Sequence, residues 1–206
     1  MVDEQRIHPR LVLASRSPRR RELLDRAGVR YELASTMVDD SGLVAGRGVE
    51  PEQWVMALAY LKAAGGCEGI TGDGDVVVLG SDTVCVDGGA VLGQPSDEAH
   101  AERMLRGFVG RTHRVLTGVA LVNPATGHRE LFYDSAVVRW GDVDQGEIGS
   151  YIASGQWRGK AGAYNLDERL SAGWPIEYEG DPGTIMGLPM RMLLDRLSAW
   201  SVEVGA

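Results

Sequence analysis

The sequence feature that most constrains the fold is a short apolar run that leads directly into the start of a helix. Residues Leu11 to Ala14 are apolar or small, as in a buried strand. Ser17 and Pro18 follow closely, and these residue types are favoured at the cap and the first position of a helix. Helical spacing then continues to Gly28, which is placed to end the helix. The junction presents backbone N–H groups and the positive end of the helix dipole, and it therefore predicts an anion site.

Hydroxyl and guanidinium groups are concentrated at the same junction. The side chains are those of Ser15, Ser17, Arg19, Arg20 and Arg21. The planar fork of arginine matches phosphate oxygens, whereas the helix dipole disfavours cations in the first turn. Three consecutive arginines at this position therefore require an anionic partner, and we expect a cradle for a triphosphate. The alternative is an ordinary solvated first turn, which the pattern favours less.

The overall charge limits what the ligand can be. The chain has 206 residues, a net charge of −8 and a pI near 5.0. A nucleic-acid polymer needs a basic surface, so the local arginine cluster suits a small anionic ligand better. The sequence has neither an apolar run of membrane-spanning length nor a signal peptide, and we expect a cytoplasmic protein without a membrane partner. Its two cysteines are expected to form neither a disulfide framework nor a zinc site.

Asp82 is the carboxylate to which we assign most weight. It lies between the apolar segments 75–79 and 84–86, where a charge is costly unless it is paired or binds a metal. A buried aspartate that caps a turn is the alternative, and we favour catalysis because reacting groups are frequent at strand ends in α/β sheets. Lys62 falls on or beside the inward stripe of a helix that starts at Pro51. It points either into a phosphate-binding cleft or outward along the helix surface.

A segment of small residues later in the chain carries two further candidates. Residues 155–165 contain Lys160 and Tyr164 among glycines and alanines, which let a ligand approach the backbone closely. Both side chains are candidates for binding a nucleotide, and the alternative is an ordinary surface loop. His113 lies at the entrance of a strand, and we interpret it as structural.

The remaining pattern places these segments within a single domain, 1–206, without a separable linker. Further strands are expected at 31–34, 90–92, 114–122 and 131–138, further helices from Ser96, Asp144 and Leu188, and glycine-rich loops at 41–48 and 65–74.

The segment Ala14-Ser-Arg-Ser-Pro-Arg-Arg20 resembles the opening signature of the Maf family, which are nucleoside triphosphate pyrophosphatases. Further segments match the family's motifs in the expected order over most of the chain. They are Leu58–Ala63, Gly80–Thr83, Gly110–Gly118, Gly159–Tyr164 and Gly187–Pro189. Each motif alone is weak, but each could have failed independently, and the chain is therefore identified as a member of the family.

The resemblance implies an α/β fold, with an elongated, mixed and twisted sheet, flanking helices and two lobes around a central cleft. It implies that a nucleoside triphosphate is hydrolysed to the monophosphate and pyrophosphate, with a divalent metal such as Mg²⁺ or Mn²⁺. It also implies a homodimer. The arginine motif and the motif around Lys160 resemble those of the branch that acts on dTTP and UTP.

The resemblance also assigns roles by position. Binding of the substrate and its phosphates would fall to Ser15, Ser17, Arg19, Arg20, Lys160 and Tyr164. Asp40 and Asp82 would hold the metal, Asp82 would activate the attacking water, and Lys62 would support catalysis. The chemistry is reasonable in itself, because Mg²⁺ prefers carboxylates together with phosphate oxygens.

Three positions depart from the family's pattern. Gln94 stands where lysine is usual, Asp167 where glutamine is common, and Asp40 where glutamate is usual. A lost cation and an added carboxylate both weaken the attraction for a triphosphate. They keep open a second function, a nucleotide-binding regulatory protein of low turnover, linked to control of the division septum. A third function, as an RNA-binding or phosphate-sensing module, fits poorly with the acidic charge.

Overall fold

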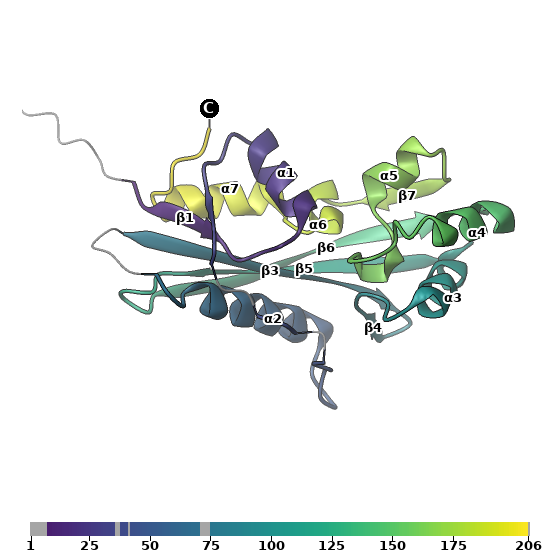
Figure 1. Ribbon diagram of the computed structural model, residues 1–206, viewed down its shortest axis with the longest axis horizontal. Helices are drawn as coiled ribbons and strands as arrows, with labels where there is room; N and C mark the ends of the chain where they lie inside the picture. Colours follow the sequence, from purple (N-terminus) through teal and green to yellow (C-terminus); the bar gives the residue numbers. More distant parts are fainter. Residues whose placement is uncertain (1–7, 36–37, 41, 71–74, 206) are drawn as a thin grey trace, which may run out of the picture.

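The computed structural model describes residues 8–35, 38–40, 42–70 and 75–205, and its centre is one twisted, open, mixed sheet (Figure 1). In the described residues the sheet has seven strands in the order β2-β1-β3-β5-β6-β7, and β4 also pairs with β3. The strands are β1 (Arg10–Leu13), β2 (Glu32–Leu33), β3 (Val76–Asp87), β4 (Ala90–Leu92), β5 (Thr112–Val122), β6 (Arg129–Trp140) and β7 (Ile176–Glu179). β1 runs parallel to β2 and β3, and the other pairs are antiparallel. The expected mixed α/β architecture is confirmed.

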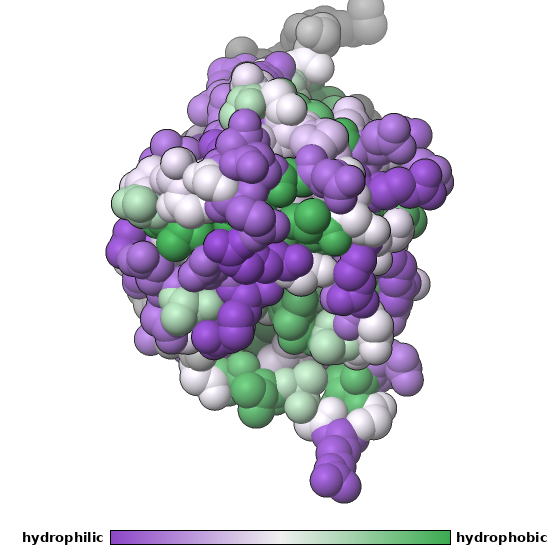
Figure 2. Space-filling model, turned by 90° about the vertical axis from the view of Figure 1, so that its right-hand side faces the viewer, coloured by the Kyte–Doolittle hydropathy of each residue, from purple (hydrophilic) through white to green (hydrophobic). Residues whose placement is uncertain are grey.

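Helices cover both faces of this sheet. They are α1 (Pro18–Arg26), α2 (Pro51–Gly66), α3 (Glu98–Phe108), α4 (Gln145–Ala153), α5 (Leu166–Ser171), α6 (Pro182–Met186) and α7 (Met190–Ala199), with a 3₁₀ turn at Ala161–Ala163. α2 covers one face, α1, α6 and α7 pack on the opposite face, and α3, α4 and α5 gather at one end (Figure 1). Polar side chains cover much of that end, with smaller apolar areas between them (Figure 2).

β3 has two different partners along one of its edges. Val76–Leu79 pair with β1, and Cys85–Asp87 pair with β4. Within the described part of the chain, no strand pairs with this edge over residues 80–84, whereas β5 pairs continuously with the other edge. The sequence analysis places Asp82 at a strand end between the apolar segments 75–79 and 84–86. This is wrong, because β3 continues through Asp82 as one strand that pairs with β5. It is the strands paired with this edge of β3 that are interrupted, because β1 ends before Gly80 and β4 begins to pair only at Cys85.

α2 packs very close to the sheet because two glycines face it. At Gly80, an added Cβ would lie 2.3 Å from the carbonyl oxygen of Ala59. At Gly118, it would lie 2.5 Å from the carbonyl oxygen of Val55. Both distances are far inside van der Waals contact, so side chains larger than hydrogen would push the helix away. This approach brings Lys62 of α2 next to the middle of β3.

On the face opposite α2, the buried side chains form two clusters. One packs α1 and α7 on β1 and β3, and it includes Leu11, Leu13, Leu24, Leu79, Leu193 and Leu197. The other is rich in aromatic rings and includes Phe108, Trp140, Tyr151, Trp157, Tyr164 and Trp174. These two clusters are the cores of two lobes that share one sheet. Each lobe contributes side chains to the cavity described below.

Some element boundaries differ from the sequence-based expectations. Ser96 was expected to cap α3, but the cap is Asp97, whose carboxylate accepts a hydrogen bond from the backbone N–H of His100 at 2.7 Å. α2 continues to Gly66, into the segment predicted as a glycine-rich loop, of which residues 71–74 lie outside the described residues. The elements β7, α5 and α6 were not predicted. They are only four to six residues long and carry too little periodicity.

Other expectations hold. Asp144 caps α4 by accepting from the backbone N–H groups of Gly146 and Glu147, and β4 occupies the segment predicted as a strand at 90–92. Residue 41, the first of the loop expected at 41–48, lies outside the described residues. In the ranges that the structure describes, no helix is long and apolar enough to cross a membrane.

Candidate active site

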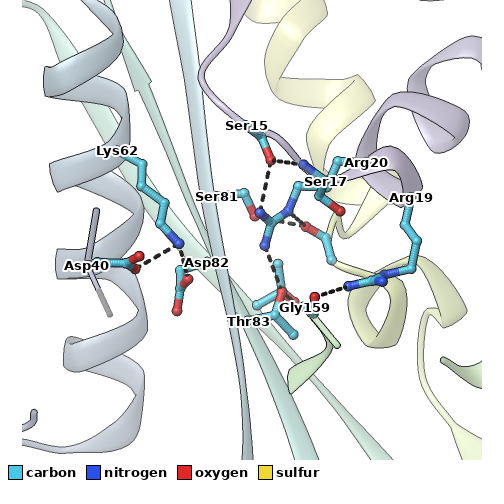
Figure 3. A network of polar contacts seen from close by, with 12 residues as sticks. Ser15, Ser17, Arg19, Arg20, Asp40, Lys62, Ser81, Asp82, Thr83 and Gly159 are labelled. Atoms are coloured by element: carbon cyan, nitrogen blue, oxygen red, sulfur yellow. Dashed lines mark hydrogen bonds and ion pairs between the residues drawn. The ribbon is translucent and has the colours of Figure 1, made fainter. Parts of the chain in front are cut away.

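The guanidinium group of Arg20 is held in one orientation by three hydrogen bonds. Its Nε donates to the carbonyl oxygen of Gly187 at 2.9 Å, and its terminal nitrogens donate to Oγ of Ser15 and Oγ1 of Thr83, both at 3.1 Å (Figure 3). Burial lowers the pKa of Arg20 to about 10, while the nearby Asp82 carboxylate opposes this shift, so the group stays charged at neutral pH. A guanidinium carries more N–H donors than these partners use, and the rest can bind an anion.

The start of α1 follows the sequence-based expectation. Ser17 is the cap residue and Pro18 opens the helix, but the Ser17 hydroxyl makes no capping hydrogen bond. Instead, the backbone N–H of Ser17 donates to Oγ of Ser15 at 3.2 Å. Arg19 reaches across to the other lobe, where it donates to the carbonyl oxygen of Gly159 at 3.0 Å (Figure 3). Burial lowers the pKa of Arg19 from its ordinary value.

Lys62 bridges two carboxylates on the α2 face of the sheet. Its Nζ lies 2.5 Å from Oδ1 of Asp82 and 2.9 Å from Oδ2 of Asp40 (Figure 3). The side chains of Lys62, Asp82 and Asp40 are 16%, 12% and 24% exposed. Two anions around one cation leave a net negative charge in a partly dry position. Such a cluster attracts a further cation. Of the two alternatives for Lys62, the structure confirms the first: its side chain points into the cleft rather than outward along the helix surface.

Lys160 and Tyr164 come from the aromatic lobe, and both are buried. Lys160 forms an ion pair with Glu168, and burial lowers the pKa of Lys160 although the Glu168 carboxylate opposes the shift. The hydroxyl of Tyr164 lies 2.9 Å from Nε2 of His113, which stacks on Phe108. The placement of His113 within the core agrees with its structural interpretation.

These side chains line a cavity of about 890 Å³ and an adjoining inner cavity of about 60 Å³. The larger cavity includes Ser15, Ser17, Arg19, Arg20, Asp40, Lys62 and Lys160 in its wall, and the inner cavity includes Asp82 and Tyr164. The structure therefore brings together, from both lobes and from α2, every residue to which the resemblance assigns a role. Arg21, which the sequence also placed in the triphosphate cradle, is not among the residues that line either cavity, so this part of the prediction is wrong. The larger volume is in the range of sites for small-molecule ligands.

Two of the departures from the family's pattern also lie on this wall. Gln94 and Asp167 both line the larger cavity. Oδ2 of Asp167 lies 3.7 Å from Nη1 of Arg26, so part of its charge is balanced by a neighbour. An unbalanced carboxylate would oppose a triphosphate more strongly.

Sequence reasoning missed several groups that complete the site. Ser81 and Thr83 flank Asp82 on the strand, and Ser81 donates to the carbonyl oxygen of Gly187 at 2.8 Å. Gly187 has φ of 115°, a conformation that side chains rarely adopt, and its place in a family motif was the available signal. Glu168, the partner of Lys160, carried no signal in the sequence.

The carboxylates present fit a divalent cation that also binds phosphate. In the described ranges, no group of three or more His, Cys, Asp or Glu residues is placed to hold a metal ion. Asp40 and Asp82 nevertheless converge on one cationic point, the ammonium group of Lys62. Mg²⁺ is commonly bound through one or two carboxylates, with water and substrate phosphates as the other ligands, so two carboxylates are a suitable set.

Comparison with known proteins agrees with the motifs. Residues 10–200 match the family described as Maf-like protein. The chain is 39% identical over 198 residues to dTTP/UTP pyrophosphatase of Moorella thermoacetica (95% of this chain, 97% of that protein). It is 35% identical over 195 residues to that of Bacillus thuringiensis subsp. konkukian (95% and 97%), and 39% identical over 198 residues to that of Desulfitobacterium hafniense (95% and 87%).

Among solved structures, the chain is similar to a nucleoside-triphosphatase, dITP/XTP pyrophosphatase, from Mycobacterium abscessus. The sequence identity is 14% and the TM-score 0.37, over 65% of this chain and 75% of that chain. The family match, by contrast, extends from the first strand of the sheet to the last helix, and the relatives align over nearly the whole chain. The chain belongs to the Maf family.

Proposed function

We propose that the chain is a nucleotide pyrophosphatase that hydrolyses dTTP and UTP to the nucleoside monophosphate and pyrophosphate. The observation that carries this proposal is the placement of Asp40, Asp82 and Lys62 on one side of β3 and of an arginine cradle on the other, around the two adjoining cavities. Hydrolysis of an anhydride needs a base for water and cations for the departing phosphates, and the cavity offers both. The names of the relatives support the choice of bases.

In the proposed reaction, water attacks the α-phosphorus, and the bond from that phosphorus to the α–β bridging oxygen breaks. Asp82 borders the inner cavity and takes up the proton of the attacking water. Arg19, Arg20 and Lys160 hold the β- and γ-phosphates and stabilise the negative charge that develops on the leaving pyrophosphate. Lys62 keeps the Asp82 carboxylate in position.

The remaining side chains bind the phosphates and the cation or form the wall of the cavity. Ser15 and Ser17 offer hydroxyls beside the start of α1, where the helix dipole favours phosphate. Tyr164 contributes to the wall of the inner cavity. Asp40 and Asp82 would hold a divalent cation, Mg²⁺ or Mn²⁺, and this cation would neutralise charge on the triphosphate when bound.

The proposed protein is a single domain that acts on a nucleotide in the cytoplasm as a homodimer. A single domain over residues 1–206 is supported by the one sheet that both lobes share. The net charge of −8 supports a nucleotide rather than a nucleic-acid polymer as ligand, and such a substrate is found in the cytoplasm. A homodimer is supported by exposed apolar side chains on β6, Leu131 and Tyr133, which are 38% and 41% exposed.

The test is release of pyrophosphate by the purified protein from dTTP, UTP, CTP, GTP and 7-methyl-GTP, with Mg²⁺ or Mn²⁺. We expect turnover of dTTP and UTP. Asp82→Asn is expected to lower kcat by at least about 100-fold, because the amide cannot accept the proton of water. Asp195→Asn, at an exposed position of α7, is the matched control and should keep the activity of the unchanged protein.

A second candidate is a nucleotide-binding regulatory protein of low turnover, which Gln94 and Asp167 on the cavity wall favour. The same assay separates the two functions when it is combined with binding measured by titration calorimetry. Tight binding of dTTP without release of pyrophosphate would overturn the enzymatic proposal in favour of this one.

A further inference from the structure

A chain of hydroxyl groups leads from Arg20 into the sheet, away from the larger cavity. Oγ1 of Thr83, which accepts from Arg20, lies 2.9 Å from Oγ1 of Thr117. Oγ1 of Thr117 in turn donates to the carbonyl oxygen of Thr184 at 2.6 Å. Thr117 and Thr184 are fully buried, at 0% exposure. Burial of a hydroxyl costs free energy unless the group is hydrogen-bonded, and the fold meets this requirement by bonding these hydroxyls to one another and to a carbonyl oxygen.

The two ends of this chain fix the direction of every hydrogen bond in it. A threonine hydroxyl has one proton, and a carbonyl oxygen can only accept. Since Thr117 gives its proton to the carbonyl of Thr184, it must accept the proton of Thr83. Thr83 therefore turns a lone pair toward Arg20, which can only donate. The inner end of the chain thus takes up the Thr83 proton and leaves the lone pairs of this hydroxyl directed toward the guanidinium.

The same row of the sheet also positions the second partner of Arg20. Thr83 is paired with Thr117, and Thr117 with Asp134, across three neighbouring strands. The hydroxyl of Thr184 donates to Oδ2 of Asp134 at 2.5 Å, so α6 is attached to this row by both its backbone and its side chain. α6 leads directly into Gly187, whose carbonyl oxygen accepts from Nε of Arg20.

We propose that Thr117 is a positioning residue for the reaction at this site. Thr117 fixes the direction of the Thr83 hydroxyl and the position of α6, and both of these contact Arg20. It thereby holds the Arg20 guanidinium in the orientation that binds the triphosphate. Among the described residues that line the two cavities, Thr117 is not included, so it acts only through these neighbours. The proposal rests on the proposed function, because it takes the ligand of Arg20 to be the substrate phosphates.

The experiment compares Thr117→Val, which removes the hydroxyl and keeps the shape, with Thr117→Ser, which keeps the hydroxyl and removes a methyl group. Thr112→Val is the matched control, at an exposed position of the same strand. For each protein, kcat and KM for dTTP, the inhibition constant of pyrophosphate and the melting temperature are measured, all at a temperature where the variants are folded.

We expect Thr117→Val to raise both the KM for dTTP and the inhibition constant of pyrophosphate about tenfold, the typical effect of losing the orientation of one charged hydrogen bond. Thr117→Ser should stay within about twofold of the unchanged protein in both constants even where its melting temperature falls. A structural role alone would make the constants follow the melting temperature instead.

Two results would overturn the inference while leaving the proposed function intact. One is a Thr117→Val enzyme with unchanged KM and inhibition constant. The other is a Thr117→Ser enzyme as impaired as the valine variant. If the unchanged protein releases no pyrophosphate, the proposed function fails by itself, and calorimetric binding of dTTP to the same variants still decides on Thr117. Weaker binding to the valine variant alone supports the inference, and equal binding, or none by any of the proteins, overturns it.

Discussion

Asp82 and Thr83 are consecutive residues of β3, yet they contact opposite sides of the sheet. Oδ1 of Asp82 lies 2.5 Å from Nζ of Lys62 on α2, whereas Oγ1 of Thr83 lies 3.1 Å from the guanidinium of Arg20 on α1. Side chains alternate across a strand, so two adjacent positions suffice to place an anionic and a cationic half on the two faces. Residues of both halves line the inner cavity, beside a part of β3 with which neither β1 nor β4 pairs.

Gly80→Ala tests the close packing of α2 on β3. The added Cβ would meet the backbone of α2, and we expect the free energy of unfolding in urea to fall by about 1–3 kcal/mol. Gly107→Ala is the matched control, because a Cβ there meets nothing within 4 Å. That variant should gain roughly 0.5–1 kcal/mol, since alanine favours a helix interior more than glycine does. Unchanged stability of Gly80→Ala would contradict the packing described.

Arg20→Lys tests whether the shape of the guanidinium matters beyond its charge. Lysine keeps the positive charge but cannot bond Gly187, Ser15 and Thr83 in one plane. We expect kcat/KM for dTTP to fall about 100-fold, which is typical when an oriented donor to a developing anion is lost. Arg30→Lys is the control, since the Arg30 side chain is 81% exposed and pairs with Glu203. Similar losses in both variants would argue against an oriented role for Arg20.

Glu168→Gln tests the ion pair that occupies Lys160. The carboxylate of Glu168 lies on the cavity wall, where it competes with phosphate for the Lys160 ammonium group. Its neutralisation is expected to lower the KM for dTTP about threefold with little change in kcat, a modest effect because Glu168 is partly exposed. Glu147→Gln on α4 serves as the control. A higher KM for Glu168→Gln would instead mean that the ion pair holds Lys160 in its binding position.

His113 makes the fold sensitive to acid. Burial lowers the pKa of His113 to about 4, from an ordinary value of 6.5. As the pH falls below about 6.5, the imidazole of His113 becomes protonated in the unfolded chain, whereas in the folded chain it stays neutral until about pH 4. The free energy of unfolding should therefore fall across this range, by up to about 3 kcal/mol from this residue.

His113→Phe isolates this contribution, because a phenyl ring can also stack on Phe108 but cannot titrate. Urea unfolding at pH about 7 and about 4.5 is expected to show a smaller pH dependence in the variant than in the unchanged protein. Equal slopes in the two proteins would show that the acid sensitivity arises elsewhere.

Much of the fold and of the site could be predicted from local patterns. The apolar run before Ser17 and Pro18 is indeed β1 followed by α1, and the motif resemblance led to the correct family and to a mixed sheet. The charged residues that the motifs contain, such as Asp82 and Lys62, do meet around one cavity. Charge in an apolar context is informative because a folded protein tolerates it only where it is paired or used.

The remainder depends on contacts between distant segments, which leave no local pattern. Thr83, Thr117 and Thr184 are ordinary threonines in the sequence, and only the strand register and the position of α6 align their hydroxyls. Glu168 belongs to the site only because it pairs with Lys160. It lies on α5, a helix too short for its periodicity to be detected in the sequence. The single strand across residues 80–84 was missed because pairing with β5 outweighs the local break in the apolar pattern.

An unpaired strand edge is a hazard in most proteins, because another polypeptide can add a strand to it and begin aggregation. The open part of β3 is bounded by β1 at one end and by β4 at the other. An incoming strand would collide with both before it could form a continuous ladder of hydrogen bonds. The two short neighbours that leave this stretch of β3 unpaired therefore also shield its edge from another chain.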